Sequence, residues 1–177
     1  GIMRILLAGG GSGGHVTPLK AITEALKMES TDLDITVFTD RGFYTESKKI
    51  FADETDVQLR KIFSGKYRRY SNKSFVWHIV HLPTLLKNIR DVALLGIGFF
   101  QSLSYFLLHK PDVVFCKGGF VCVPIGLVAS LFKVPIVIHD SDTRPGLTNR
   151  ILAKHASTIA TGMPTSFYPY AAEKMVY

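Results

Sequence analysis

Short apolar runs alternate with longer segments of helical pattern along this chain of 177 residues. Each run has the length of a strand and is rich in β-branched or aromatic residues, and the segments between the runs are long enough for crossover helices. The runs cover residues 4–8, 33–39, 57–63, 112–116, 134–139 and 157–161. Parallel strands that are covered on both faces read as nearly continuous apolar runs. The pattern therefore predicts one α/β domain in which an open parallel sheet lies between two layers of helices.

A glycine-rich segment, residues 9–14, follows the first run directly and leads through His15 into a helical pattern over residues 16–28. Six small residues at this junction leave the backbone free to adopt positive φ angles and to approach a ligand closely. The N–H groups at the start of the helix point outward, where they attract negative charge. We therefore expect this segment to bind an anionic group.

The glycines also match the fingerprint of dinucleotide-binding domains. Gly9, Gly11 and Gly14 fit the pattern G-x-G-x-x-G. Asp40 ends the second run, where such a domain places its ribose-binding acid. The additional glycines make this match easy to reach by chance, and a cofactor loop gives no reason for His15 at the start of the helix. A dinucleotide-binding module stays open as the alternative to a site built around His15.

Polar residues follow three of the predicted strands. They are the glycine segment with His15, residues 117–119, and residues 139–142. The carboxyl ends of parallel strands meet at one edge of the sheet, and ligands of such folds bind there. We expect all three clusters to face one crevice.

Positive charge dominates the composition. The chain has 21 Lys and Arg against 14 Asp and Glu, which gives a net charge of +7 and an isoelectric point near 9.5. This balance favours an anionic partner, which could be a phosphate, a nucleic acid or an acidic lipid. No nucleic-acid-binding motif is present, so we expect no nucleic acid. Cys116 and Cys122 have neither the number nor the spacing of a disulfide framework or a zinc site. We expect a reducing, cytoplasmic setting and no metal.

Much of this charge lies in one segment, residues 57–90, which contains eight Lys or Arg and no Asp or Glu. Apolar residues recur there at helical spacing, and Pro83 is expected to kink or restart the helix. One interpretation places this apolar stripe in the core. The other is a patch that settles on an anionic bilayer. The patch residues are Phe75, Trp77, Ile79 and Lys73.

A second long apolar segment covers residues 92–108 and has only three polar interruptions. Its 17 residues fall at the lower limit for a membrane-spanning helix. A predicted strand follows after only two intervening residues, Lys110 and Pro111. We therefore interpret the segment as a crossover helix buried against the sheet, with Gly96 and Gly98 allowing close packing.

Several motifs together resemble glycosyltransferase family 28, in the branch that transfers N-acetylglucosamine in peptidoglycan synthesis. They occur in the family's order over nearly the whole chain. The motifs are residues 9–18 (GGGSGGHVTP), 65–69 (GKYRR), 111–114 (PDVV), 118–121 (GGFV), 139–142 (HDSD), 145–150 (PGLTNR) and 152–154 (LAK).

This resemblance implies the amino-terminal half of a GT-B enzyme, which has two Rossmann-like domains. In the family the first domain binds a lipid acceptor and the second binds UDP-N-acetylglucosamine. Residues 1–177 would then be the acceptor-binding domain, without the donor-binding domain and inactive alone. The implied reaction is an inverting transfer of N-acetylglucosamine to the 4-hydroxyl of lipid I, undecaprenyl-diphospho-muramoyl-pentapeptide. No cofactor is implied, and the protein would lie peripherally on the cytoplasmic face of the cell membrane.

The resemblance also implies site residues. His15 corresponds to the family's histidine, acting as the general base or as a ligand of the diphosphate, and Asp140 is a second catalytic candidate. The glycine segments would hold the acceptor's pyrophosphate through backbone N–H groups. The acceptor and diphosphate candidates are Gly10, Gly11, Ser12, Gly13, Gly14, Lys66, Arg68, Arg69, Gly118, Gly119, Asp142 and Asn149.

Two motifs depart from the family. The usual His-Glu-Gln-Asn is here residues 139–142, HDSD, and the usual Tyr-Val-Ser is here residues 120–122, FVC. Asp142 adds a charge that could act as a base or repel a phosphate, and Cys122 lacks a hydroxyl. These departures leave the exact acceptor open. A related transferase with another acceptor, or the acceptor subunit of a split N-acetylglucosaminyltransferase, are the alternatives within the same superfamily.

Overall fold

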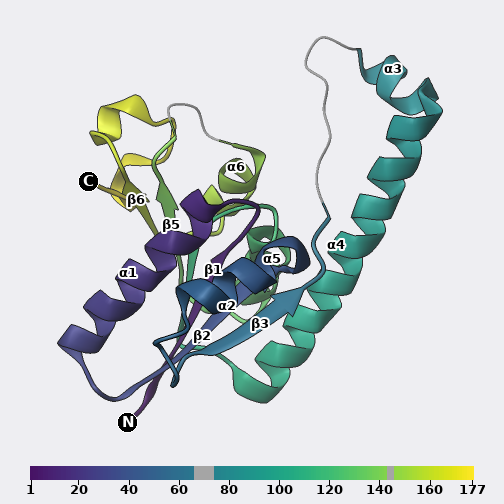
Figure 1. Cartoon of the computed structure of the whole chain (residues 1–177). Coiled ribbons are helices and arrows are strands. Elements are labelled where there is room, and N and C mark those ends of the chain that lie inside the picture. The colour runs from purple at the N-terminus through teal and green to yellow at the C-terminus, as the bar shows by residue number, and fades with distance from the viewer. Residues whose placement is uncertain (66–73, 143–145) are drawn as a thin grey trace.

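The structure is a computed structural model that describes residues 1–65, 74–142 and 146–177. Its sheet has seven strands in the order β3-β2-β1-β4-β5-β6-β7, and every neighbouring pair is parallel (Figure 1). The α/β fold with an open parallel sheet is therefore confirmed. The strands are β1 (Met3–Gly9), β2 (Leu33–Asp40), β3 (Gln58–Ile62), β4 (Val113–Gly118), β5 (Ile136–Asp140), β6 (Thr158–Thr161) and β7 (Met175–Val176). The first six follow the predicted runs, and β7 was not predicted.

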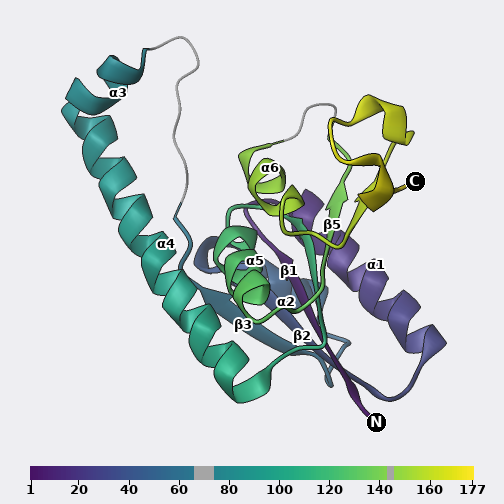
Figure 2. The ribbon, with the colours of Figure 1, turned by 180° about the vertical axis from the view of Figure 1, so that it is seen from behind.

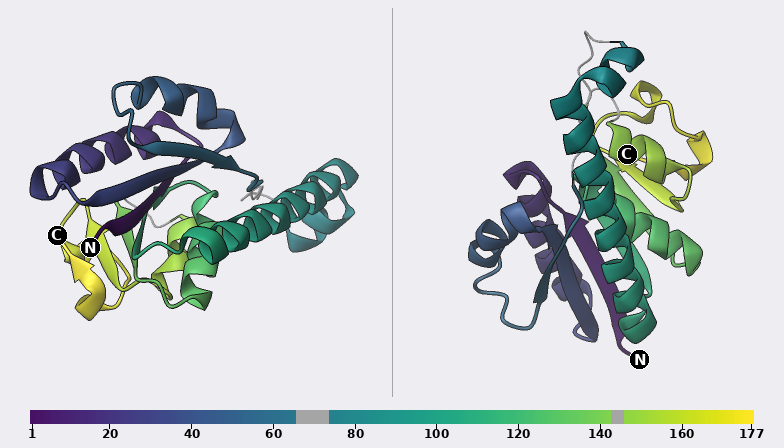
Figure 3. Two further views of the ribbon diagram at one scale, coloured as in Figure 1. Left: turned by 90° about the horizontal axis from the view of Figure 1, so that it is seen from below. Right: turned by 90° about the vertical axis from the view of Figure 1, so that its right-hand side faces the viewer.

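Helices cover both faces of the sheet. They are α1 (Gly13–Glu29), α2 (Tyr44–Ile50), α3 (Phe75–Val80), α4 (Leu82–His109), α5 (Cys122–Leu131) and α6 (Leu147–Ala153), with short 3₁₀ turns at Arg41–Phe43, Thr165–Phe167 and Ala172–Lys174. Seen along the sheet, α1 and α2 lie on one side, and α4 and α5 lie on the other (Figure 3). The upper part of α4, with α3 at its end, projects beyond the sheet (Figure 2).

Two hydrophobic cores follow from the alternation of side chains along β1. Ile5 and Leu7 point to the α1 face, where they pack in a cluster with Leu19. Leu6 and Ala8 point to the opposite face and pack in the larger cluster under α4 and α5. Since successive strand residues face opposite sides, a central strand buried on both faces needs an uninterrupted apolar run. The glycine segment therefore leaves the sheet from an interior strand.

Helix α4 is longer and more exposed than the sequence suggested. It begins at Leu82, directly after the non-helical His81, so Pro83 restarts a helix as expected. Only one side of α4 is buried, and residues such as Val92 and Phe100 on the other side are exposed. The prediction that residues 92–108 are buried against the sheet is therefore only partly right. By length and composition alone α4 could cross a membrane, a test that core helices and signal sequences also pass.

Two glycines of α4 behave differently. A Cβ added to Gly98 would lie 1.7 Å from the backbone oxygen of Phe63, whereas a Cβ on Gly96 would meet nothing within 4 Å. The segment after β3 also touches α4 at Gly65, where a Cβ would lie 2.5 Å from the Asp91 backbone oxygen. Close packing is thus confirmed for Gly98 and was wrong for Gly96.

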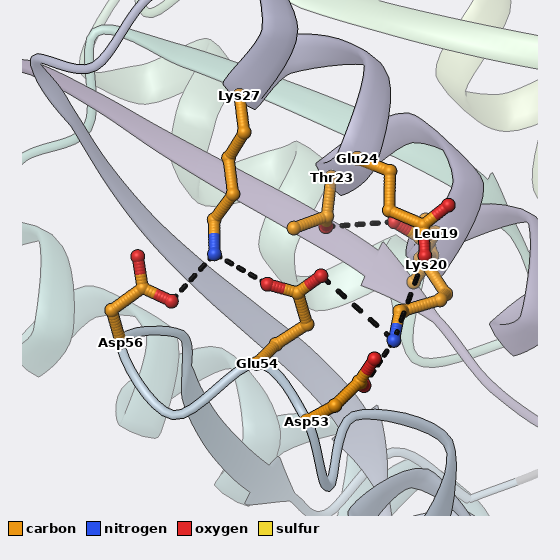
Figure 4. A network of polar contacts seen from close by, with 8 residues as sticks. All are labelled: Leu19, Lys20, Thr23, Glu24, Lys27, Asp53, Glu54 and Asp56. Atoms are coloured by element: carbon orange, nitrogen blue, oxygen red, sulfur yellow. Dashed lines mark hydrogen bonds and ion pairs between the residues drawn. The ribbon is translucent and has the colours of Figure 1, made fainter.

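An ionic network fixes the connection between α2 and β3 to helix α1 (Figure 4). Lys20 pairs with Asp53 and lies 3.8 Å from Glu54. Lys27 pairs with Glu54 and lies 2.5 Å from Asp56. The hydrogen bond from the Lys20 ammonium stabilises the charged form of Asp53 and so holds the pKa of that carboxyl below its usual value. The network aligns the chain as it enters β3, at the edge of the sheet.

Candidate functional site

Two glycine loops interlock at the carboxyl ends of β1 and β4. The Gly10 N–H donates to the Gly118 carbonyl oxygen at 3.1 Å. A Cβ on Gly119 would lie 2.3 Å from the Gly10 carbonyl oxygen. Both Gly118 and Gly119 have positive φ angles, +152° and +92°. Side chains at these positions would be strained and would separate the loops, so the approach of the two loops depends on glycine.

His15 is held in one orientation by these loops. Its Nδ1 lies 2.7 Å from the Gly10 carbonyl oxygen. A carbonyl oxygen can only accept, so Nδ1 carries the proton in this contact, and the neutral ring keeps its lone pair on Nε2. The ring lies against Gly118, where a Cβ would be 2.8 Å from Nε2. An imidazole held in this orientation can accept a proton only at Nε2.

The start of α1 provides a place for an anion. Ser12 occupies the N-cap position, but its hydroxyl makes no capping hydrogen bond, and the first turn contains no acidic residue. Gly11 is exposed with a φ of +79°, and a Cβ there would meet nothing within 4 Å. The first-turn N–H groups of Gly13 and Gly14 thus face outward without a side-chain cap. This arrangement favours binding of a negatively charged group.

The structure corrects the catalytic role expected of Asp140. This side chain is 1% exposed. Its Oδ2 accepts from the Tyr170 hydroxyl at 2.5 Å, and its Oδ1 accepts from the Asp142 N–H at 2.9 Å. A general base must reach the proton that it removes, and both oxygens of this carboxylate are already occupied inside the domain. In this structure Asp140 holds the chain in place after β5.

Tyr170 is the residue of this region that sequence reasoning missed. Burial, followed by its hydrogen bond to Asp140, raises the pKa of the Tyr170 hydroxyl far above its usual value. The hydroxyl therefore stays protonated and donates to the carboxylate at any physiological pH. Thirty positions separate the two residues in sequence, and no local motif links them, so the pair could be found only from the fold.

Lys117 connects the ends of β4 and β5. It is buried, and its Nζ donates to the Ser141 hydroxyl at 3.5 Å. Burial, and to a smaller extent the charge of Lys117, lowers the pKa of His139, so His139 is neutral at pH 7. The expectation that residues 117–119 and 139–142 come together at one edge is met by this contact and by the pairing of β4 with β5.

The remaining candidates are placed as follows. Asp142 is exposed, and Asn149 is buried on α6. The basic candidates Lys66, Arg68, Arg69 and Lys73 lie outside the described residues. Within the described ranges, the only group of three side chains close enough to share a metal ion is Glu24, Asp53 and Glu54. Its carboxylates already surround the Lys20 ammonium on α1.

Comparison with known proteins identifies the family. Residues 5–161 match the model of the glycosyltransferase family 28 N-terminal domain. The chain belongs to glycosyltransferase family 28. In this family 28 chain the Asp40 side chain accepts from the Phe43 N–H at 2.9 Å, capping the turn after β2.

Curated relatives are longer proteins named as transferases. The chain is 35% identical over 174 residues to the UDP-N-acetylglucosamine--N-acetylmuramyl-(pentapeptide) pyrophosphoryl-undecaprenol N-acetylglucosamine transferase 3 of Bacillus thuringiensis (strain Al Hakam), covering 98% of this chain and 44% of the relative. It is 36% identical over 161 residues to the transferase of that name in Lachnospira eligens, covering 91% and 40%. The family 28 chain therefore spans less than half the length of these relatives.

Solved structures share the fold. The crystal structure of Acinetobacter baumannii MurG superimposes with a TM-score of 0.68 at 21% identity, covering 98% of this chain and 45% of that one. A UDP-N-acetylglucosamine 2-epimerase superimposes with a TM-score of 0.65 at 10% identity, covering 99% and 47%. At these identities the likeness supports the Rossmann-like fold of the family 28 chain and nothing more specific.

Proposed function

We propose that this family 28 chain is the acceptor-binding half of an inverting glycosyltransferase that moves N-acetylglucosamine from UDP-N-acetylglucosamine to lipid I in peptidoglycan synthesis. The observation that carries the proposal is the fixed imidazole of His15, whose Nδ1 is held by the Gly10 carbonyl oxygen. It is supported by the 35% identity to transferases named for this reaction. The donor sugar would be bound by a second half, as in those longer relatives.

In this proposal His15 is the general base, and the fixed orientation of its ring supports that role. The acceptor's 4-hydroxyl oxygen attacks the anomeric carbon of the donor sugar, and the bond from that carbon to the UDP oxygen breaks. UDP leaves with the electron pair, and the hydroxyl proton passes to Nε2 of His15. Attack from the face opposite UDP inverts the anomeric configuration. The N–H groups at the start of α1 would hold the acceptor diphosphate beside this base.

A membrane-facing surface is the second part of the proposal. On α3 and the first turns of α4, Phe75 is 79% exposed, and Ile79, Leu82 and Leu86 are exposed as well. Trp77 is half-buried and stacks on His81 with ring centroids 4.3 Å apart. The interpretation of this stripe as core is therefore wrong. Exposed apolar residues in a strongly basic segment support peripheral binding to the anionic cytoplasmic face of the cell membrane.

Replacing His15 tests the catalytic role. The experiment uses the protein together with its donor-binding half. His15→Ala should lower kcat by roughly two to four orders of magnitude, the contribution of a positioned base. Thr17→Ala, an exposed change on the same turn of α1, is the matched control and should retain kcat. An unchanged kcat in His15→Ala would remove His15 as the base.

Vesicle binding tests the membrane surface. The 177-residue protein should co-sediment with phosphatidylglycerol vesicles, and less so as salt rises. The double variant Phe75→Ser with Ile79→Ser should bind more weakly, because each lost apolar side chain removes roughly 1.5–3 kcal/mol of burial. Met28→Ser, which is also exposed but lies at the far end of α1, should bind like the parent. Absence of binding at low ionic strength would refute this surface.

A further inference from the structure

A cavity of about 630 Å³ opens between the edge strand β3 and the middle of helix α4. It lies two strands away from the glycine loop of β1 in the sheet order, and five of its lining residues belong to α4. The site described above makes no use of it. Its lining residues are Phe38, Arg60, Lys61, Ile62, Ile97, Phe100, Gln101, Ser104 and Tyr105.

The polar part of the lining includes two side chains with N–H groups, Arg60 and Gln101. Arg60 lies over the Tyr105 ring, 5.0 Å from its centroid. A guanidinium stacked on a ring keeps its N–H edge available for a bidentate contact with a phosphate. The Gln101 Oε1 accepts from the Phe63 N–H at 2.9 Å, which leaves the amide NH₂ group of Gln101 to donate elsewhere. Arg60 and the amide of Gln101 are thus oriented donors in one cavity.

The Arg60 guanidinium has no acidic partner among the residues that the structure describes. The lining contains no Asp or Glu. In the part of the chain that the structure describes, neither Arg60 nor Lys61 forms an ion pair. Lys61 points to the opposite side of the sheet, where its Nζ lies 4.8 Å from the centroid of the Tyr44 ring on α2, so Arg60 is the cation that faces the cavity. The cavity is therefore electrostatically complementary to an anion.

The apolar part of the lining continues out of the cavity along α4. Ile97 and Phe100 are 46% and 67% exposed, and they share one side of the helix with Leu86 and Ile89, which are exposed as well. The helical rise from Ile97 back to Leu86 is about 16 Å. A phosphate alone would leave this apolar surface uncovered, whereas an acyl chain would cover it and gain burial.

We propose that this cavity binds an anionic phospholipid, with the headgroup phosphate on Arg60 and Gln101 and an acyl chain along Ile97 and Phe100. The bound lipid would fix the protein on the membrane at a second point, on α4, in addition to the patch on α3. The site is separate from the glycine loops, so its failure would leave the proposed transfer reaction intact.

An acidic peptide is the competing occupant. Strand β3 is the edge of the sheet, and an exposed edge can pair with an extended segment of another protein. A peptide strand would use the backbone groups of β3 and would not need the apolar surface beyond the cavity. The continuity of that surface with the lining favours the lipid.

The test uses lipids that dissolve as monomers, so that a bilayer surface plays no part. The 177-residue protein is titrated by calorimetry with dihexanoyl phosphatidylglycerol below its critical micelle concentration. Dihexanoyl phosphatidylcholine, with the same chains and no net charge, and inorganic phosphate are titrated in parallel. We expect phosphatidylglycerol to bind at least about ten-fold more tightly than either, since charge-assisted contacts are the strongest polar contacts available here.

Variants locate the binding. Arg60→Gln should weaken phosphatidylglycerol binding about ten-fold, and Phe100→Ser should weaken it several-fold through lost apolar contact. Lys48→Gln is the matched control, because Lys48 also approaches the Tyr44 ring, at 5.0 Å, but does not line the cavity. It should change binding less than two-fold, and far-UV circular dichroism should show that all variants fold.

Three results would overturn the proposal. Equal binding of inorganic phosphate, with no effect of Phe100→Ser, would make this a simple anion site. Equal weakening by Lys48→Gln and Arg60→Gln would show a diffuse attraction with no defined site. Tighter binding of an extended glutamate-rich peptide, lost in Arg60→Gln, would assign the cavity to strand addition by a protein partner.

Discussion

Gly96 and Gly98 look alike in the sequence, but adding a methyl group to each should affect the stability of the protein differently. In Gly98→Ala the new Cβ would lie 1.7 Å from the Phe63 backbone oxygen and 2.9 Å from its carbonyl carbon. Both neighbours are backbone, so α4 must move by more than 1 Å to reach ordinary contact distance. In Gly96→Ala the methyl group meets nothing within 4 Å. The same substitution is therefore expected to raise the free energy of unfolding at Gly96 and to lower it at Gly98.

The magnitudes follow from two opposing effects. Replacing glycine by alanine inside a helix stabilises it by about 0.5–1 kcal/mol. At Gly98 this gain is opposed by overpacking, which costs about 1–3 kcal/mol. A shift of α4 also strains the bond from Gln101 to the Phe63 N–H and the bond from the Ser102 hydroxyl to the Gly98 oxygen, each worth about 1 kcal/mol. We expect Gly96→Ala to gain about 0.5–1 kcal/mol and Gly98→Ala to lose about 2–3 kcal/mol.

Urea unfolding followed by far-UV circular dichroism measures both values, with Gly96→Ala as the control for helix propensity. For a domain of this size the Gly98→Ala loss corresponds to a fall in Tm of roughly 4–12 °C. If Gly98→Ala were as stable as Gly96→Ala, α4 would not pack on the segment after β3 as described. The cavity proposed for lipid would then lose one of its walls.

Three further substitutions have expected outcomes. Tyr170→Phe removes the donor to the buried Asp140 carboxylate and should cost about 1–2 kcal/mol in urea unfolding; no change would mean that the pair does not anchor the chain after β5. Lys20 holds the pKa of Asp53 below its ordinary value of 3.8, so this contribution to stability is present above that pH and is lost as the pH falls through the lower folded value. As the pH falls from about 5 to about 2, the free energy of unfolding should therefore decrease less in Lys20→Gln than in the parent protein. Curves of this free energy against pH that run parallel for the two proteins would contradict this. Gly119→Ala, at a φ of +92°, should cost about 1–3 kcal/mol and disturb the glycine loops, which amide NMR shifts would report; an unperturbed spectrum would contradict the interlocked geometry.

Most of the fold could be predicted because the sheet is buried on both faces. A strand such as β1 must then be apolar at nearly every position, and its ends are set by glycine or by charged residues. The position of His15 could be predicted for the same reason, since the order of strand, glycines and helix determines where the first turn of α1 lies. The meeting of the 118–119 loop with the 9–14 loop followed from the rule that the ends of parallel strands share one edge.

The features that sequence could not supply depend on contacts between distant segments. The hydrogen bond from Tyr170 to Asp140 joins residues with no shared local pattern, so Asp140 could not be recognised as buried. The exposure of α4 also could not be predicted, because an apolar helix has the same composition whether its surface meets a core or solvent. The two-residue strand β7 is too short to carry an apolar pattern of its own.

The partner of His15 is part of the main chain. In many enzymes a side-chain carboxylate orients the basic imidazole, and a single mutation can remove it. Here the Gly10 carbonyl oxygen takes that place, and a main-chain oxygen is not removed by exchanging a side chain. Loss of this contact therefore requires a change in the course of the backbone, so the orientation of the His15 ring does not depend on any single side-chain partner.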